Sequence, residues 1–188
     1  MLVQINNLKN LLLGISVFGL VGCASFYDKT VEQPASYHAP QVVDQSYNID
    51  GRFSIIAQDK NYYGNFTWAH ENDFDKLALN SPLGNSVAVI SVESGIATLQ
   101  TKDGAYTGSN LDGLLKERMG FTLPLAYLHY WVQGIPLPDY PVENKLTSGF
   151  QQFGWNIEYL EWADSNHPSL VQVSKTGLKI KLLISNWN

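Results

Sequence analysis

Residues 47–57, with the sequence YNIDGRFSIIA, alternate between apolar and polar side chains. The positions of one parity are Tyr47, Ile49, Gly51, Phe53, Ile55 and Ala57, and polar residues occupy the positions between them as far as Ser54. Successive side chains of a β-strand point to opposite faces, so a period of two residues indicates a strand with one buried face. The stretch therefore predicts a strand that gives one face to a hydrophobic core.

The same period returns along most of the chain after residue 57. It is found over residues 62–68, 77–79, 87–92 and 96–101, and again over residues 145–153, 155–159, 170–174 and 178–184. Short turns such as Glu93-Ser94-Gly95 separate these stretches. Consecutive strands joined by short turns predict an antiparallel meander.

Two segments between residues 109 and 134 carry apolar residues at helical spacing instead. In the first, Ser109 is placed to cap a helix whose apolar positions are Leu111, Leu114, Leu115 and Met119. In the second, Thr122 is placed as the cap and Gly134 as the end, with Leu125, Leu128, Trp131 and Val132 on one face. We therefore expect one strongly curved antiparallel sheet with helices against its concave side.

The N-terminus has the parts of a lipoprotein signal sequence. A short polar stretch containing Lys9 precedes an apolar run over residues 11–21, which is too short to span a bilayer comfortably. Leu20-Val21-Gly22-Cys23 then matches the bacterial lipobox, in which the cysteine thiol receives diacylglycerol and the small residue before it admits the signal peptidase. We expect residues 1–22 to be removed and Cys23 to carry the lipid; the alternative is a buried or disulfide-bonded cysteine.

The segment after Cys23 differs in composition from the rest. Residues 24–44 are polar, are interrupted by Pro34 and Pro40, and show neither a helical nor a strand period. The sequence thus predicts a lipidated flexible tether over residues 23–44 and one folded domain over residues 45–188. The net charge of −5 and the lack of clustered cations argue against nucleic-acid binding.

The sequence shows no catalytic or metal-binding pattern. His38, His70, His129 and His167 are scattered without ligand spacing, and Gly84-Asn85-Ser86 does not complete the G-x-S-x-G motif of hydrolases. We therefore expect no catalytic residues, no metal and no enzyme. The inward-facing aromatic residues are compatible either with a filled core or with a partly empty shell that holds an apolar ligand, and periodicity alone does not separate the two.

A turn between two predicted strands has an unusual residue at its tip. In Ser81-Pro82-Leu83-Gly84, Pro82 sets the turn and Gly84 accepts backbone conformations that other residues avoid. Leu83 lies between them, where a large aliphatic side chain is uncommon. Either Leu83 folds back under the sheet, or it is an exposed apolar group that touches a membrane or a cargo molecule.

Taken in order, these motifs resemble the LolB family of outer-membrane lipoprotein receptors. The resemblance rests on the lipobox, Gly51-Arg52-Phe53, the stretch YGNFTW at 63–68, Pro82-Leu83-Gly84, the stretch WVQGIP at 131–136, the stretch GWNIEY at 154–159, and the closing LKIKL at 178–182 with Trp187. Ser81 departs from the asparagine that we would expect more often there. Together the motifs cover almost the whole domain predicted for the mature protein.

The resemblance implies an open, incomplete antiparallel β-barrel covered by an α-helical lid, with a hydrophobic cavity for acyl chains. It implies that the periplasmic carrier LolA delivers lipoprotein cargo and that the protein, a monomer anchored in the outer membrane and facing the periplasm, inserts the cargo there. Ala24, rather than aspartate, after the lipidated cysteine agrees with outer-membrane sorting. No cofactor is implied beyond the N-acyl and S-diacylglycerol groups on Cys23.

The resemblance also assigns sites. Pro82, Leu83 and Gly84 form the loop that assists membrane insertion. From strand parity and helical face, the residues expected to line the cavity are Phe53, Ile55, Phe66, Trp68, Leu79, Leu114, Trp131, Ile157 and Ile180. Two other functions remain open at this point: a structural or assembly lipoprotein with a filled core, and an envelope hydrolase. The soluble carrier LolA would share the fold but lacks the lipidated cysteine.

Overall fold

The computed structural model describes residues 36–58 and 60–188 of the chain. Its eleven β-strands form one antiparallel sheet, and two helices lie between the sixth and seventh strands in sequence. The strands are β1 (Ser46–Ala57), β2 (Lys60–Glu71), β3 (Phe74–Asn80), β4 (Ser86–Glu93), β5 (Ile96–Thr101), β6 (Gly104–Gly108), β7 (Asn144–Leu146), β8 (Gly149–Gln152), β9 (Trp155–Trp162), β10 (Pro168–Lys175) and β11 (Leu178–Trp187). The helices are α1 (Leu111–Met119) and α2 (Leu125–Trp131).

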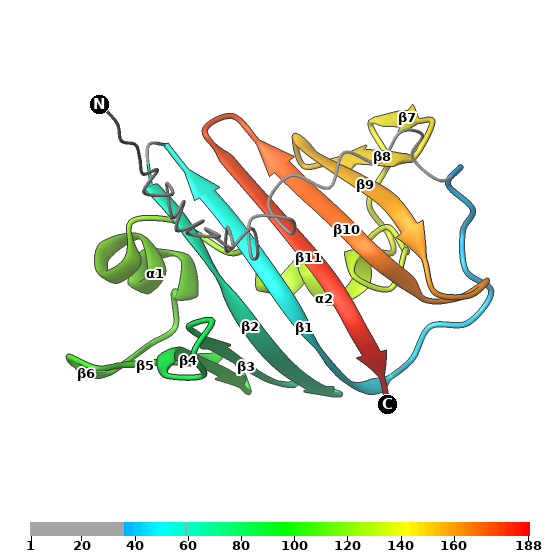
Figure 1. Ribbon diagram of the computed structural model, residues 1–188. Coiled ribbons are helices and arrows are strands. Elements are labelled where there is room, and N and C mark those ends of the chain that lie inside the picture. Colours follow the sequence, from blue (N-terminus) through cyan, green and yellow to red (C-terminus); the bar gives the residue numbers. More distant parts are fainter. Residues whose placement is uncertain (1–35, 59) are drawn as a thin grey trace, which may run out of the picture. The chain divides into compact units, whose positions relative to one another are not determined.

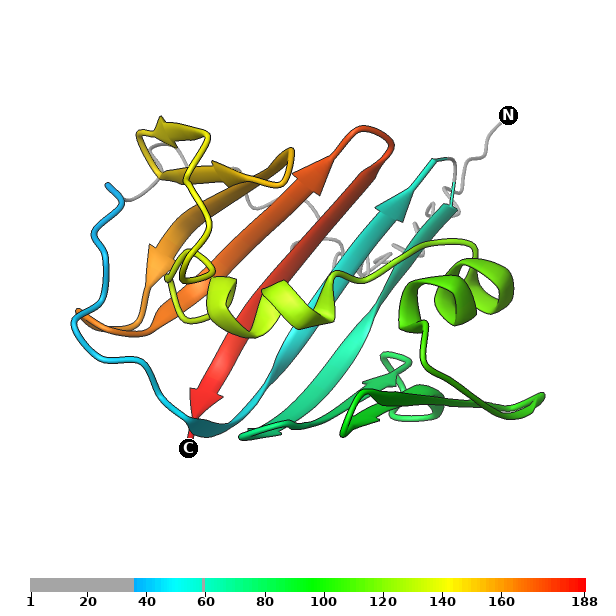
Figure 2. The ribbon, with the colours of Figure 1, turned by 180° about the vertical axis from the view of Figure 1, so that it is seen from behind.

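The order of strands across the sheet is β6-β5-β4-β3-β2-β1-β11-β10-β9-β8-β7. Each strand therefore pairs with its neighbour in sequence, except that β1 pairs with β11 and joins the two ends of the domain. The outermost strands β6 and β7 do not pair with each other, so the barrel is open. Because α1 and α2 connect these two edges, the chain must cross one face of the sheet, and Figure 2 shows α2 lying across β1 and β11.

The central pairing of β1 with β11 requires a glycine. The register of the two strands shifts between Asp50 and Gly51, and a Cβ atom on Gly51 would collide with the carbonyl oxygen of Leu183. Only glycine lets the two backbones approach this closely. The Gly51-Arg52-Phe53 motif noted in the sequence is thus explained by strand pairing at the middle of the sheet.

The core lies between α2 and the sheet face that α2 covers. Phe53 and Ile55 of β1 and Phe66 and Trp68 of β2 are at most 3% exposed, as is Leu128 of α2. These strand residues are the ones that the period of two had assigned to the inner face. The mainly β fold with an open sheet and a helical lid is therefore confirmed.

Local boundaries differ from the expectations in two places. Helix α1 is capped by Asn110, whose side chain accepts a hydrogen bond from the Gly113 amide (3.0 Å), and not by Ser109. Helix α2 begins after Pro124 without a side-chain cap, so the expected cap at Thr122 is wrong. Proline can precede the first helical residue because it has no amide hydrogen that would need a partner.

Strands were expected over residues 145–153, and the structure has the hairpin of β7 and β8 there. Strand β6 was not expected. It is an edge strand, and none of its side chains is fully buried. An edge strand of this kind has no alternation for sequence analysis to detect.

Residues 36–44, the last part of the predicted tether, lie against the domain. Tyr37 stacks on Tyr159 with ring centroids 5.4 Å apart, and its hydroxyl donates to the carbonyl of Gly134 (3.1 Å). The ring of His38 lies 4.0 Å from that of Trp162. These contacts explain why a segment without any periodic pattern takes a defined path, visible in blue in Figure 1.

The predictions for residues 1–35, including the signal sequence and Cys23, lie outside the described residues.

Candidate functional site: the cavity under the lid and the exposed hairpin loop

A small apolar cavity lies between the sheet and helix α2. Its volume is about 20 Å³, which is close to the roughly 10–15 Å³ that one water molecule needs. Its lining side chains are all aliphatic or aromatic: Phe53, Ile55, Phe66, Trp68, Leu77, Leu79, Leu123, Leu128, Ile180 and Leu182. A molecule in this cavity would meet hydrocarbon on every side.

Six of the nine residues expected to line a cavity do line this one: Phe53, Ile55, Phe66, Trp68, Leu79 and Ile180. Trp131 and Ile157 are fully buried in other parts of the core. Leu114 is only half-buried, whereas its neighbour Leu115 is fully buried and faces the core. The helical period alone could not choose between these two adjacent leucines.

Four lining residues were missing from the expected set, namely Leu77, Leu123, Leu128 and Leu182. Leu77 and Leu182 have the same strand parity as residues that were chosen, and Leu128 lies on the expected inner face of its helix. Leu123 precedes the helix, and no periodic signal marks it. Its position depends on how the segment before α2 crosses the sheet.

The C-terminal end of the lid is held by buried hydrogen bonds. The indole Nε1 of Trp131 donates to Oε1 of Gln152 (3.0 Å), and the hydroxyl of Tyr159 donates to the carbonyl of Trp131 (2.8 Å). Burial, together with the neighbouring Tyr37, raises the pKa of Tyr159 well above its ordinary value, so its hydroxyl keeps the donated proton. Gln133 accepts a hydrogen bond from the amide of Asp44 (2.8 Å) and so joins the lid to the segment before β1.

The N-terminal approach to the lid, residues 120–125, is held in a different way. Phe121, Leu123 and Leu125 are at most 4% exposed and contribute apolar packing. A hollow of about 270 Å³ lies beside this approach, lined in part by Phe121, Trp155 and Leu178. The lid therefore has a hydrogen-bonded end and an end held mainly by packing, which borders an opening.

The loop between β3 and β4 presents Leu83 to solvent. Leu83 is 90% exposed, the largest fraction among the exposed large hydrophobic residues. The amide of Gly84 donates to the carbonyl of Ser81 (2.9 Å), and the amide of Ser81 donates to the carbonyl of Asn85 (2.8 Å). Gly84 has φ +86°, so the three-residue loop uses a left-handed glycine to close the hairpin. Leu83 projects outward rather than folding back under the sheet.

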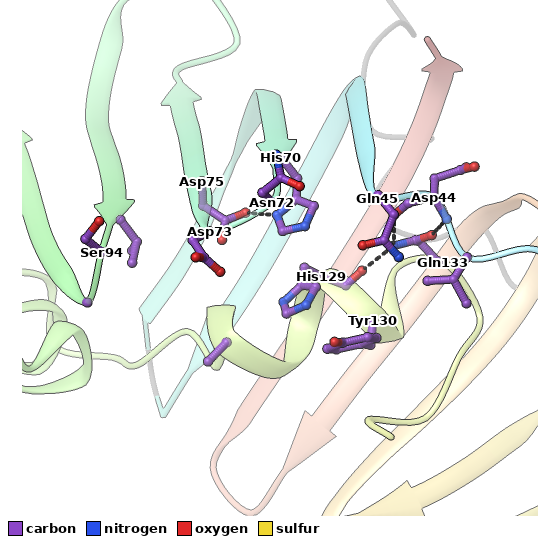
Figure 3. A pocket seen from close by; sticks show the side chains of 14 residues that line it. Asp44, Gln45, His70, Asn72, Asp73, Asp75, Ser94, His129, Tyr130 and Gln133 are labelled. Atoms are coloured by element: carbon purple, nitrogen blue, oxygen red, sulfur yellow. Dashed lines mark hydrogen bonds and ion pairs between the residues drawn. The ribbon is translucent and has the colours of Figure 1, made fainter. Parts of the chain in front are cut away.

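A polar hollow of about 670 Å³ lies at the end of the sheet opposite to that loop (Figure 3). In it, Nδ1 of His70 lies 2.9 Å from Oδ1 of Asp75, and the indole Nε1 of Trp68 donates to the same oxygen (2.8 Å). The ring of His129, on the lid, stacks on the ring of His70. Trp68 also lines the apolar cavity, so Asp75 satisfies the one polar atom of a side chain that is otherwise buried in hydrocarbon.

The pKa of His129 is lowered from its usual value. Burial is the main cause, because it disfavours the charged ring, and the adjacent His70 acts in the same direction. Asp75 and the carbonyl of Leu125 act in the opposite direction and offset part of this shift. His129 is therefore favoured in its neutral form where the lid meets the sheet.

The described part of the chain contains no group of three or more His, Cys, Asp and Glu side chains arranged to hold a metal ion. Within the same residues, neither helix has the length and the apolar character needed to cross a bilayer.

Comparison with known proteins identifies the family of this chain. The family model described as "Outer membrane lipoprotein LolB" matches residues 45–187. The outer-membrane lipoprotein LolB of Chromobacterium violaceum is 31% identical over 182 residues, covering 94% of this chain and 97% of the relative. Those of Nitrosomonas europaea and Cellvibrio japonicus are each 28% identical, over 185 and 188 residues, and cover 89% and 92% of this chain and 87% and 93% of the respective relative. The chain therefore belongs to the LolB family of lipid-anchored outer-membrane lipoproteins, which act in lipoprotein localisation.

Proposed function

We propose that this protein accepts lipoproteins from the periplasmic carrier LolA and inserts them into the outer membrane, holding their acyl chains between the sheet and the lid. The observation that carries the proposal is the wholly apolar lining of the space under α2. A site that binds a sugar, nucleotide or peptide needs polar groups to fix its ligand, whereas an acyl chain needs only apolar surface. LolB is a lipoprotein-localisation family and not an enzyme family.

The volume of the cavity implies that the lid moves. A space of about 20 Å³ holds no acyl chain, so cargo enters only if side chains and the lid are displaced. The end held by Gln152 and Tyr159 is the fixed point, because breaking those buried hydrogen bonds is costly. Residues 120–125 are the part that swings away from the sheet, on the side where the neighbouring hollow opens.

The transfer needs no nucleotide. Each methylene group of the cargo is worth about 0.8 kcal/mol when buried, in the carrier as in the acceptor, so these large terms nearly cancel. A difference of about 1.4 kcal/mol in favour of the acceptor is enough to shift the equilibrium tenfold. The bilayer then takes the acyl chains as the final acceptor.

In this proposal the acyl groups on Cys23 are the only non-protein component, and they hold the protein at the membrane through the tether. The protein acts as a monomer, with LolA, lipoprotein cargo and the membrane as its partners. Pro82, Leu83 and Gly84 form the loop that assists release into the bilayer.

Site-directed photo-crosslinking in the full-length lipidated protein tests whether acyl chains enter the cavity. A benzophenone amino acid replaces Phe66, which faces the cavity, and, as the control, Tyr63, which is 61% exposed and lies on the same strand. Cargo lipoprotein is delivered from LolA and the sample is irradiated. We expect an adduct between the position-66 probe and the acylated N-terminus of the cargo, and no such adduct from position 63.

The alternative is a structural or assembly lipoprotein, and the small volume of the cavity favours it. In such a protein the core is filled, so the probe at position 66 would give no adduct with the cargo, even when the protein is folded and LolA carries cargo. That result, or equal labelling from positions 66 and 63, would overturn the transfer function.

A further inference from the structure

The described lysine and arginine residues are unevenly distributed over the domain. Six lysine and arginine residues lie at one end, here called the basic end: Lys60, Lys102, Lys116, Arg118, Lys175 and Lys179. All six are exposed. The other four described cations, Arg52, Lys76, Lys145 and Lys181, lie elsewhere.

The sheet topology brings the basic residues together. Lys60 follows the β1–β2 turn, Lys102 lies in the β5–β6 turn, and Lys175 and Lys179 flank the β10–β11 turn. Because Ala57 pairs with both Lys60 and Leu178, the first and last of these turns lie side by side. In Figure 1 they lie at the upper left, with α1, whose last turn carries Lys116 and Arg118, below them.

The opposite end is acidic. Asp44 precedes β1, Glu71 and Asp73 lie at the β2–β3 turn, Glu93 ends β4, and Asp164 lies between β9 and β10. The net charge of the chain is −5, so the basic end is an exception to the overall charge and not a reflection of it. A separation of charge of this kind gives the domain a preferred orientation near a charged surface.

Leu83 belongs to the basic end. The β3–β4 loop lies on the same side of the meander as the β1–β2 and β5–β6 turns, since antiparallel strands alternate in direction. A hollow of about 760 Å³ lies next to the loop, and its lining includes Lys60, Lys102 and Arg118 together with Val87 of β4. The acidic groups in this lining are Asp103 and Glu117, and Glu117 lies 3.1 Å from Arg118. Asp112 of α1 and Glu143, whose carboxylate accepts from the amide of Gly154 beside Lys175, also lie at this end.

We propose that the basic end is a docking surface for a bilayer with anionic phospholipid headgroups, whose phosphates face these cations while Leu83 enters the apolar boundary. The choice of an anionic bilayer as the partner rests on charge complementarity between these lysine and arginine side chains and the lipid phosphates. Burial of one leucine is too little to hold a domain in one orientation, and cations near an anionic bilayer add attraction that acts at a distance. The inference rests on the proposed function for the direction of release: cargo leaving beside residues 120–125 emerges at this end.

The test uses the full-length lipidated protein in vesicles. Asn85, next to Leu83 in the loop, is replaced by cysteine and labelled with a dye whose emission reports entry into a bilayer; the only natural cysteine is Cys23, which the lipid blocks. Vesicles of phosphatidylcholine alone are compared with vesicles that also contain phosphatidylglycerol. We expect the dye to enter the bilayer when phosphatidylglycerol is present, and raised salt to reverse the effect.

Charge variants identify the surface. In vesicles with phosphatidylglycerol, Lys102→Gln lowers the ratio of inserted to free loop about fivefold, and Lys60→Gln with Lys102→Gln lowers it about thirtyfold, since each cation near the surface contributes about 1 kcal/mol. The matched control is Lys76→Gln, an exposed lysine on β3 toward the acidic end, which leaves the ratio unchanged. Equal insertion without phosphatidylglycerol, or equal effects of Lys102→Gln and Lys76→Gln, would overturn the proposal.

Cargo capture by the position-66 probe is measured on the same vesicles, so that failure of the two proposals can be told apart. If cargo is captured but insertion of the loop does not depend on charge, the docking surface is wrong and the transfer function stands. Charge-dependent insertion without capture supports the docking surface and overturns the transfer function. If the charge variants slow delivery from LolA but leave insertion unchanged, the basic end contacts the carrier and the membrane assignment is wrong.

Discussion

His129 of the lid helix stacks on His70 of strand β2, with ring centroids 4.7 Å apart and planes 17° from parallel. Nδ1 of His70 lies 2.9 Å from a carboxylate oxygen of Asp75 on β3. The ring of Tyr47 on β1 also stacks on the ring of His70, with centroids 5.2 Å apart. One ring of the lid thus contacts a ring of the sheet directly. Protonation of His129 therefore changes the energy of the closed lid.

We expect His129 to make the protein less stable as the pH falls through the ordinary histidine range. The pKa of His129 is lowered in the folded protein, by burial first and by His70 second, so the unfolded chain binds a proton that the folded chain resists. The contribution of neutral His129 to the free energy of unfolding is fully present above the unfolded pKa of about 6.5 and decreases as the pH falls below it. Urea unfolding at about pH 7.5 and about pH 5.5 measures the slope. In His129→Phe, which keeps an aromatic ring but does not titrate, the slope should be smaller; an unchanged slope assigns it to other groups.

His167 should have the opposite pH dependence. Its partial burial lowers its pKa, but hydrogen bonds to Asp164 and Asp44 outweigh this and raise the pKa overall. The contribution to stability is therefore fully present below the unfolded pKa and is lost as the pH rises through the folded pKa. We expect His167→Gln to destabilise the protein at about pH 6 and to have little effect at about pH 8.5, as measured by chemical unfolding. A loss of equal size at both pH values would indicate a packing effect.

Leu83→Glu should leave folding and cargo uptake intact and slow insertion of cargo into liposomes. Leu83 is 90% exposed, so its replacement removes no packing, while the loop loses the about 1.5–3 kcal/mol of a leucine buried in the bilayer. The measurement loads the protein with lipoprotein and follows incorporation of that lipoprotein into liposomes. Asn85→Glu adds the same charge to the loop without removing the leucine and should have the smaller effect. Normal incorporation with Leu83→Glu would remove Leu83 from the mechanism.

Leu128→Ala should destabilise the closed lid. Leu128 is 2% exposed and lines the cavity, and leucine-to-alanine changes at such sites cost about 2–5 kcal/mol because the hole left behind does not collapse fully. Equilibrium unfolding measures the loss. The control is the same change at the exposed position, Leu83→Ala, which should alter the free energy of unfolding by less than about 0.5 kcal/mol. Similar values for the two variants would show that Leu128 does not pack the lid.

Gln152→Ala should lower the free energy of unfolding by about 3 kcal/mol, because it leaves several buried polar groups without partners. Gln152 is fully buried; it accepts from Trp131 and from the amide of Leu137, and it donates to the carbonyls of Leu137 and Tyr140. Its neighbour Gln151 bonds to Asn144 at the surface, so Gln151→Ala is the matched control. Equal losses in the two variants would mean that Gln152 does not hold the lid.

Local pattern was enough to identify the strands other than β6 and the inner faces of the central ones. Alternation at Phe53, Ile55, Phe66 and Trp68 follows from the geometry of the pleated strand, and a half-buried strand displays it wherever it lies in the sheet. The turn that exposes Leu83 is likewise a local matter, since Pro82 and Gly84 act through their own backbone angles.

Side-chain contacts across neighbouring strands and between distant segments decided what local pattern could not. Asp75 satisfies both Trp68 and His70, but no spacing rule marks a carboxylate for this role. Residues 36–44 have no period, yet Tyr37 and His38 pack on aromatic rings far along the chain.

The sequence by itself determined the strand pattern, the apolar character of the inner face and the tight turn that carries Leu83, because each depends on neighbours within a few residues. The exposure of Leu83 was decided by the tertiary structure. Only the tertiary structure decided how deeply Leu123 and Leu128 enter the space under the lid, and therefore that the cavity is nearly closed. It also decided that six cations lie at the same end of the domain as Leu83, since the antiparallel order of the strands brings their turns to one end. The volume of the cavity and the distribution of charge both depend on residues that are far apart in the sequence and that only the fold brings together. The order of residues along the chain does not show which of them meet.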